Sequence, residues 1–175
     1  FDLFDLDPEN LTVGVRKKGI RVDLGGIGKG YAVDVMAETL KEWDISSAIL
    51  DSGGSAILAL DPPPGESGWP VGIGRGRHRQ TLHLKHRALG ASGIAVQGEH
   101  IINPHTGQPV KNRTRVWALA SSATMADGLS TAFMIMPEKA IREVCRKHDE
   151  VSAMLLIEKR LGRKVRKFGR WDDKP

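Results

Sequence analysis

Residues 22–34 read Val-Asp-Leu-Gly-Gly-Ile-Gly-Lys-Gly-Tyr-Ala-Val-Asp, an apolar stretch that runs into glycines and then into a helical pattern. After the glycines, apolar residues recur at steps of one and three along 32–43, as on one face of an amphipathic helix. The free N–H groups at the start of such a helix can hold an anion. Lys29 at this start opposes the helix dipole unless an anionic ligand is bound. The segment is a candidate phosphate site, and a tight turn made by the glycines is an equally good interpretation.

The rest of the chain mixes short strands with helices. Apolar runs bounded by turn residues predict strands at 11–15, 20–23, 46–50, 56–60, 71–73, 81–84, 89–91, 116–120 and 151–157. A buried helix is expected over 125–136, with Pro137 starting a second helix that ends near His148. The elements lack a regular strand–helix–strand alternation, so we predict an α+β fold with a mixed, largely antiparallel sheet and packed helices.

Composition places the 175-residue chain among ordinary globular proteins, with 40% hydrophobic and 27% charged residues. The apolar runs are too short to cross a bilayer, and a single cysteine, Cys145, excludes an internal disulfide.

The segment 159–175 holds eight Lys or Arg and two Asp, a net charge of +6, whereas the whole chain carries +5. We therefore divide the chain into a nearly neutral region, 1–158, and a basic tail, 159–175. A solvated, partly frayed terminus is favoured over a tail that docks phosphate, a membrane or an acidic partner. Few aromatic residues are available to stack on bases, so we expect no nucleic-acid partner.

Two loops carry residues suited to ligand binding. Asp51-Ser52-Gly53-Gly54-Ser55 lies between two predicted strands, and its paired glycines would let a ligand approach the backbone. Taken alone, this segment fits a hairpin turn better. Residues 98–109 bring two histidines, an Asn-Pro and a Thr-Gly together. His100 could accept a proton near neutral pH, although a structural histidine explains the local pattern more readily.

Asp127 and Thr131 are four residues apart in the predicted helix over 125–136, so they project from one face. A carboxylate and a hydroxyl at this spacing can bind a hard cation such as Mg²⁺ through oxygen. A charged residue in an otherwise apolar helix needs a partner, because burying it alone is costly. An N-terminal Asp favoured by the helix dipole is an equally good interpretation.

These segments, in their order along the chain, resemble the ApbE family of FAD:protein FMN transferases. The resemblance rests on 23–34, Ser52-Gly53-Gly54, Ala91-Ser92-Gly93, 100–109 and 126–131, against family patterns such as DLGGIAKGYAVD, HIIDPRTGxP and ADALaT. It extends to about Ile157. Family members have a further segment before the first motif that helps complete the flavin pocket, and we expect this chain to lack it.

The resemblance implies a Mg²⁺-dependent enzyme that cleaves FAD, attaches FMN to a Thr or Ser hydroxyl of a target flavoprotein and releases AMP. By position, the main-chain carbonyl of Gly28 with Asp127 and Thr131 would hold Mg²⁺, and His100 would deprotonate the acceptor hydroxyl. The remaining matched positions would line the FAD pocket: Gly25, Gly26, Lys29, Gly30, Ser52, Gly53, Gly54, Ser92 and Thr106.

Three positions depart from the family pattern. Asn103 replaces the usual Asp, which we expect to lower the basicity of His100. His105 replaces the usual Arg, and Gly28 replaces Ala. The first two changes leave the three metal positions intact but place the rate and the acceptor preference in question.

Two alternatives to the transferase stay open on sequence grounds. A Mg²⁺-dependent FAD pyrophosphatase would use the same residues with water as the acceptor, and a non-catalytic flavin-binding protein would keep only the pocket. Many bacterial family members are exported lipoproteins. The resemblance therefore implies a cell-envelope or periplasmic location, with peripheral membrane association through a lipid anchor in the full-length protein; a cytoplasmic location is the alternative.

Overall fold

A six-stranded antiparallel sheet forms the centre of the molecule. The computed structural model describes residues 3–74, 76–94, 101–111, 113–159 and 162–171. The sheet order is β10-β9-β8-β7-β4-β3. Its strands are β3 (Ile49–Ser52), β4 (Ala56–Ala59), β7 (Arg87–Gly93), β8 (Arg113–Ala120), β9 (Ser152–Lys159) and β10 (Gly162–Phe168). Two hairpins, β1 (Phe4–Asp7) with β2 (Thr12–Val15) and β5 (Trp69–Ile73) with β6 (Gln80–Leu84), form separate two-stranded sheets.

In the ranges that the structure describes, the helices are α1 (Gly28–Glu42), α3 (Ala123–Ile135) and α4 (Glu138–Lys147). Together with the antiparallel pairing, they confirm the predicted α+β class. No helix in the described part of the chain is long and apolar enough to cross a membrane.

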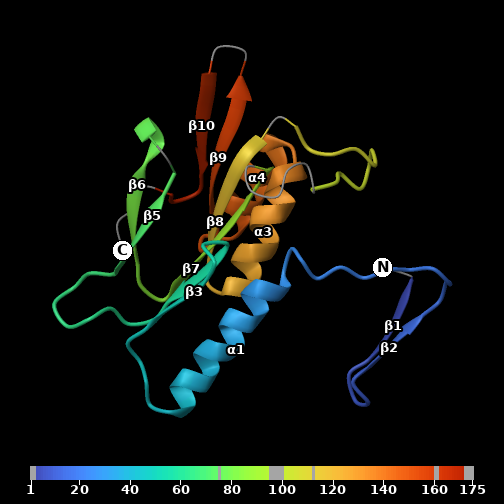
Figure 1. Cartoon of the computed structure of the whole chain (residues 1–175), viewed down its shortest axis with the longest axis horizontal. Coiled ribbons are helices and arrows are strands. Elements are labelled where there is room, and N and C mark those ends of the chain that lie inside the picture. The colour runs from blue at the N-terminus through green and yellow to red at the C-terminus, as the bar shows by residue number, and fades with distance from the viewer. Residues whose placement is uncertain (1–2, 75, 95–100, 112, 160–161, 172–175) are drawn as a thin grey trace.

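The central sheet is buried on both faces because its side chains alternate. In β8, Val116 and Ala118 face the helices, whereas Trp117 and Leu119 pack on the opposite side with residues of β5 and β6. Figure 1 shows the helices on one side of the sheet and the β5–β6 hairpin on the other. The helix-covered face carries the candidate site.

The N-terminal hairpin differs from the sequence prediction. We expected strands at 11–15 and 20–23, but β2 pairs instead with β1, with Phe4 opposite Val15, and 20–23 is not a strand. The Asp7 carboxylate accepts hydrogen bonds from the backbone N–H groups of Glu9 and Asn10, which fixes the turn between residues 7 and 12. Figure 1 shows this hairpin set apart from the sheet.

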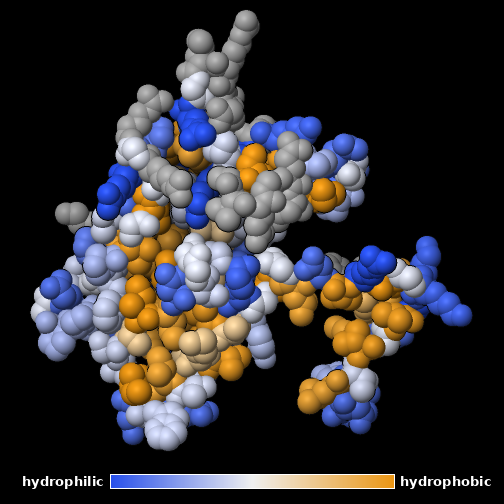
Figure 2. Space-filling model, in the orientation of Figure 1, coloured by the Kyte–Doolittle hydropathy of each residue, from blue (hydrophilic) through white to orange (hydrophobic). Residues whose placement is uncertain are grey.

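Apolar side chains remain exposed on the N-terminal hairpin and on the outer side of α1. Leu6 and Val13 on the hairpin, and Tyr31 and Val35 on α1, are all more than 45% exposed. Figure 2 shows the hydrophobic colouring of both regions on one face.

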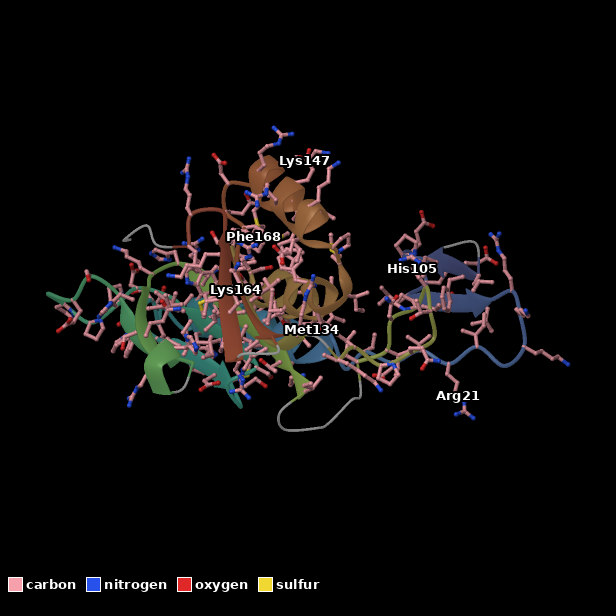
Figure 3. The ribbon with its side chains drawn as sticks, turned by 90° about the horizontal axis from the view of Figure 1, so that it is seen from above. Arg21, His105, Met134, Lys147, Lys164 and Phe168 are labelled. Carbon is pink, nitrogen blue, oxygen red and sulfur yellow. The ribbon has the colours of Figure 1, made fainter. Side chains whose placement is uncertain are left out.

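Within the basic C-terminal segment, residues 162–168 form a strand, although we expected a solvated, partly frayed terminus. β10 pairs with β9 along its whole length, from Gly162 opposite Lys159 to Phe168 opposite Ala153. Phe168 and Trp171 are buried in the two cores on either side of the sheet, while Lys164 stays exposed on the edge strand. Figure 3 shows Lys164 and Phe168 along β10. Lysine is common on edge strands because its charge blocks pairing with other chains, so the basic composition did not exclude a strand.

Candidate functional site

A cleft of about 940 Å³ lies beside the start of α1, the β3–β4 turn, the end of β7 and the middle of α3. This volume is within the usual range for small-molecule sites. Nine residues predicted from sequence line it: Gly25, Gly26, Lys29, Ser52, Gly53, Gly54, Ser92, Asp127 and Thr131. The fold thus brings together four segments that are far apart in the sequence.

Asp127 is a buried carboxylate at the base of this cleft. Only 2% of its surface is exposed, and its Oδ2 accepts a hydrogen bond from the backbone N–H of Gly30 at 3.0 Å. Burial raises its pKa, against the opposing effects of the Gly30 hydrogen bond and the positive charge of Lys29. A negative charge that its surroundings only partly compensate favours a cation in the cleft.

Thr131 lies one helical turn after Asp127 and also lines the cleft. The glycine-rich loop runs along this face of α3, with Gly26 packed against Thr131 and Gly30 against Asp127. Gly28, the first residue of α1, lies between these two contacts in the sequence. The described cleft lining includes neither Gly28 nor Gly30.

The oxygen donors at this site fit a hard cation such as Mg²⁺. Asp127 supplies one carboxylate and Thr131 a hydroxyl, and neutral oxygens commonly complete such sites. Within the described ranges, no cluster of three or more His, Cys, Asp and Glu could hold a metal. A cation beside Thr131 would therefore be held by the Asp127 carboxylate and neutral oxygens rather than by a cluster of acidic side chains.

The start of α1 is less open to an anion than its sequence predicted. The N–H of Gly28 bonds to the Leu24 carbonyl at 2.7 Å, that of Gly30 bonds to Asp127, and that of Tyr31 bonds to the Ile27 carbonyl. These three N–H groups are already hydrogen-bonded within the protein. Lys29 lines the cleft, and its Nζ donates to the Gly25 carbonyl at 3.1 Å, so its side chain places a positive charge where a phosphate could bind.

The β3–β4 turn forms another wall of the cleft. Gly53 and Gly54 have φ angles of +63° and +67°, a region that suits glycine, and neither faces another atom within 4 Å of an added Cβ. The N–H of Gly54 donates to the Asp51 carboxylate at 2.6 Å, which fixes the turn. A ligand can therefore approach this backbone closely.

Asp34 is a structural residue beneath the site whose role the sequence reasoning missed. Its carboxylate accepts hydrogen bonds from the backbone N–H groups of Ala123 and Thr124, both at 2.8 Å, and from the Thr124 hydroxyl. It thereby caps α3 from α1 and holds the two helices in register. No local signal distinguished Asp34, because a charged residue directly after an apolar one is ordinary on an amphipathic helix.

Asp34→Ala is expected to lower the free energy of unfolding by about 2 kcal/mol, because charged hydrogen bonds to the start of α3 are lost. Urea denaturation of the variant measures this loss. Glu42→Ala, at an exposed position near the end of α1, is the matched control and should stay within about 0.5 kcal/mol of the parent. Equal stability of both variants would contradict the capping role.

The third predicted segment is only partly described. His100 lies outside the described residues. Thr106 is exposed, its Oγ1 accepts from the Gln108 N–H at 3.3 Å, and it is absent from the described cleft lining. The Asn103 side chain accepts from the His105 N–H at 2.9 Å and so shapes this loop. Figure 3 shows His105 out on the loop, well away from Phe168 on β10.

Arg115 also lines the cleft and was not predicted. It comes from β8, and its guanidinium lies 5.5 Å from the centre of the Trp117 ring. Neither its residue type nor its spacing distinguishes it from the other arginines in the sequence. Only the register of β8 at its irregular end brings it to the cleft.

Comparison with known proteins gives a consistent family assignment. The sequence model of the ApbE family matches residues 2–155. A protein called FAD:protein FMN transferase from Vibrio cholerae is 33% identical over 135 residues, which cover 67% of this chain and 39% of that protein. A protein of the same name from Klebsiella pneumoniae is 29% identical over 152 residues, covering 78% of this chain and 43% of the relative. The chain therefore spans less than half the length of either relative.

Solved structures agree with this comparison. A variant of the flavin transferase ApbE from Vibrio cholerae superposes with a TM-score of 0.82 at 26% identity, and the match covers 95% of this chain and 56% of that one. The ApbE protein from Thermotoga maritima gives a TM-score of 0.79 at 27% identity, covering 95% and 57%.

Proposed function

The chain belongs to the ApbE family, and we propose that it carries the FAD-cleaving site of a magnesium-dependent FAD:protein FMN transferase. The observation that best supports this proposal is the pair Asp127 and Thr131, one helical turn apart on the cleft and packed against the glycine-rich loop. A buried carboxylate beside a lysine suits a site where a cation and phosphates meet.

Different residues of the cleft would bind different parts of FAD. Lys29 would contact the pyrophosphate, and the open backbone at Gly53 and Gly54 would let the nucleotide lie against the β3–β4 turn. Asp127 and Thr131, with the Gly28 carbonyl, would hold Mg²⁺. When bound, the ion would neutralise the charge of the pyrophosphate during phosphoryl transfer.

The acceptor step requires a base. We assign this role to His100, which would take the proton from the Thr or Ser hydroxyl of the target flavoprotein as the oxygen attacks the FMN phosphorus. The phosphorus–oxygen bond to AMP breaks as the new phosphoester forms, and AMP leaves. This assignment rests on the sequence resemblance.

The proposed activity is tested by incubating the protein with FAD, with and without Mg²⁺, and separating the nucleotides by chromatography. A candidate acceptor protein is included in parallel and scanned for in-gel flavin fluorescence. Magnesium-dependent AMP release with a fluorescent acceptor band is expected. AMP and free FMN without a band would indicate a pyrophosphatase, and FAD binding without AMP would indicate a non-catalytic flavin-binding protein.

His100→Ala is expected to slow FMN transfer by about 10²-fold or more while FAD affinity changes little, because general base catalysis contributes at this scale. Single-turnover kinetics and FAD titration measure the two quantities separately. Equal losses in rate and affinity would count against proton transfer by His100.

A further inference from the structure

Three hydroxyl groups form a connected chain beside the candidate cation site. The Ser92 Oγ lies 2.7 Å from the Ser130 Oγ and 2.9 Å from the Thr131 Oγ1. The Ser130 Oγ donates to the main-chain carbonyl of Asp127 at 2.9 Å. Ser92 comes from β7 and the other residues from α3, so the chain joins the sheet to the helix.

The direction of each hydrogen bond follows from counting protons. Each hydroxyl has one proton to donate, and a carbonyl oxygen can only accept. All three contacts can be hydrogen bonds at the same time only when Ser130 donates its proton to the Asp127 carbonyl. Ser92 must then donate to Ser130, which leaves Ser92 without a second proton. The contact between Ser92 and Thr131 can form only if Thr131 donates.

This order of hydrogen bonds determines how the Thr131 hydroxyl can interact with a ligand. With its proton directed to Ser92, the Thr131 oxygen keeps its remaining lone-pair capacity for a ligand in the cleft that it lines. A reversed chain would direct the Ser92 proton onto Thr131 and occupy one of its two lone pairs. Hydrogen bonds between a metal-binding residue and its neighbours commonly set the orientation and basicity of that residue.

We propose that Ser130, acting through Ser92, is a positioning residue that orients the Thr131 hydroxyl as an oxygen donor to a divalent cation. This inference rests on the proposed function, because it takes the cation site at Asp127 and Thr131 as its starting point. Ser130 is fully buried and is absent from the described cleft lining, so it acts on a bound ion only through its neighbours. The hydrogen bond from Ser130 to the Asp127 carbonyl would be enough to satisfy the buried Ser130 hydroxyl. The contact between Ser130 and Ser92 is therefore not needed for burial alone.

Ser130→Ala is expected to weaken Mg²⁺ binding about tenfold, measured by isothermal titration calorimetry on the FAD-free protein. Thr131→Val should abolish binding. Ser152→Ala is the matched control, because Ser152 is equally buried and its hydroxyl accepts from Arg87 away from the cleft. Its Mg²⁺ affinity should equal that of the parent.

Unchanged Mg²⁺ affinity in Ser130→Ala, together with lost binding in Thr131→Val, would overturn the positioning role and leave the metal site standing. A parent protein that binds no Mg²⁺ would overturn the metal site of the proposed function and the positioning role with it. A neutron structure of the metal-free protein tests the hydroxyl order independently. A deuterium on Thr131 directed to Ser92 supports the inference, and a deuterium on Ser92 directed to Thr131 overturns it.

Discussion

Asp127→Asn is expected to abolish magnesium-dependent AMP release while raising the melting temperature of the metal-free protein. The amide oxygen of Asn can still accept the hydrogen bond from Gly30, so the contact between α1 and α3 is kept. The substitution removes only the charge, whose burial is unfavourable. We expect activity to fall by at least about 10³-fold, since the only carboxylate among the proposed metal ligands is lost.

The increase in melting temperature of Asp127→Asn over the parent should depend on pH. Burial raises the pKa of Asp127 above its ordinary value, so the folded state binds a proton more readily than the unfolded chain. Folding is therefore favoured while this carboxyl is protonated, and that contribution is lost as pH rises through the folded pKa. The melting temperature of Asp127→Asn should exceed that of the parent at pH 7, and the two should converge below about pH 4, where the carboxyl is protonated in the folded and the unfolded protein.

Differential scanning fluorimetry with and without Mg²⁺ measures both parts of this prediction. Mg²⁺ should raise the melting temperature of the parent, because a ligand that binds only the folded state stabilises it, and should leave Asp127→Asn unchanged. Lys41→Gln, at an exposed position on α1, serves as a control that also changes one charge. A variant that melts lower than the parent at pH 7 would show that the carboxylate has a structural role.

The main helices could be predicted because they depend on local patterns, whereas the nine predicted residues that line the cleft were assigned as a set through the family resemblance. The apolar spacing along 32–43 and the four-residue interval between Asp127 and Thr131 carry their information within one helix. The outcome at the start of α1 was different, since the N–H groups of Gly28 and Gly30 bond within the protein. The Gly28 partner is local, the Leu24 carbonyl, whereas the Gly30 partner is Asp127 on α3 and depends on how α1 packs on α3.

The features that were missed depend on contacts between distant segments. Asp34 caps a helix 89 residues further along the chain, and Ser92 meets a serine 38 residues away. The basic residues at 159–175 suggested a solvated tail, because charge alone does not show that Phe168 and Trp171 are buried on opposite sides of the sheet. Such information lies in the register of strands and helices, which composition does not specify.

Gly90 lies in β7, between β4 and β8, and its backbone faces α3. A Cβ atom at this position would overlap the main-chain carbonyl of Ala126. The clash involves backbone on both sides, so no side-chain rotation can relieve it, and α3 would have to move away from the sheet. Ser92 lies two residues along the same face and contacts Ser130 and Thr131. The absence of a side chain at Gly90 therefore allows the approach that assembles the site.

Gly90→Ala is expected to lower the free energy of unfolding by about 3 kcal/mol or more, because overpacking against a backbone outweighs the usual gain of replacing glycine in a strand. Gly128→Ala is the matched control on α3 itself, where an added Cβ would meet only the Ile27 side chain at 3.9 Å. That change should stabilise the protein by up to about 1 kcal/mol through helix propensity. Urea denaturation compares the free energy of unfolding of both variants with that of the parent. Titration of folded Gly90→Ala with Mg²⁺ should show weaker binding, because Thr131 moves away from Ser92. A Gly90→Ala protein as stable as Gly128→Ala would mean that α3 lies farther from β7 than the structure places it.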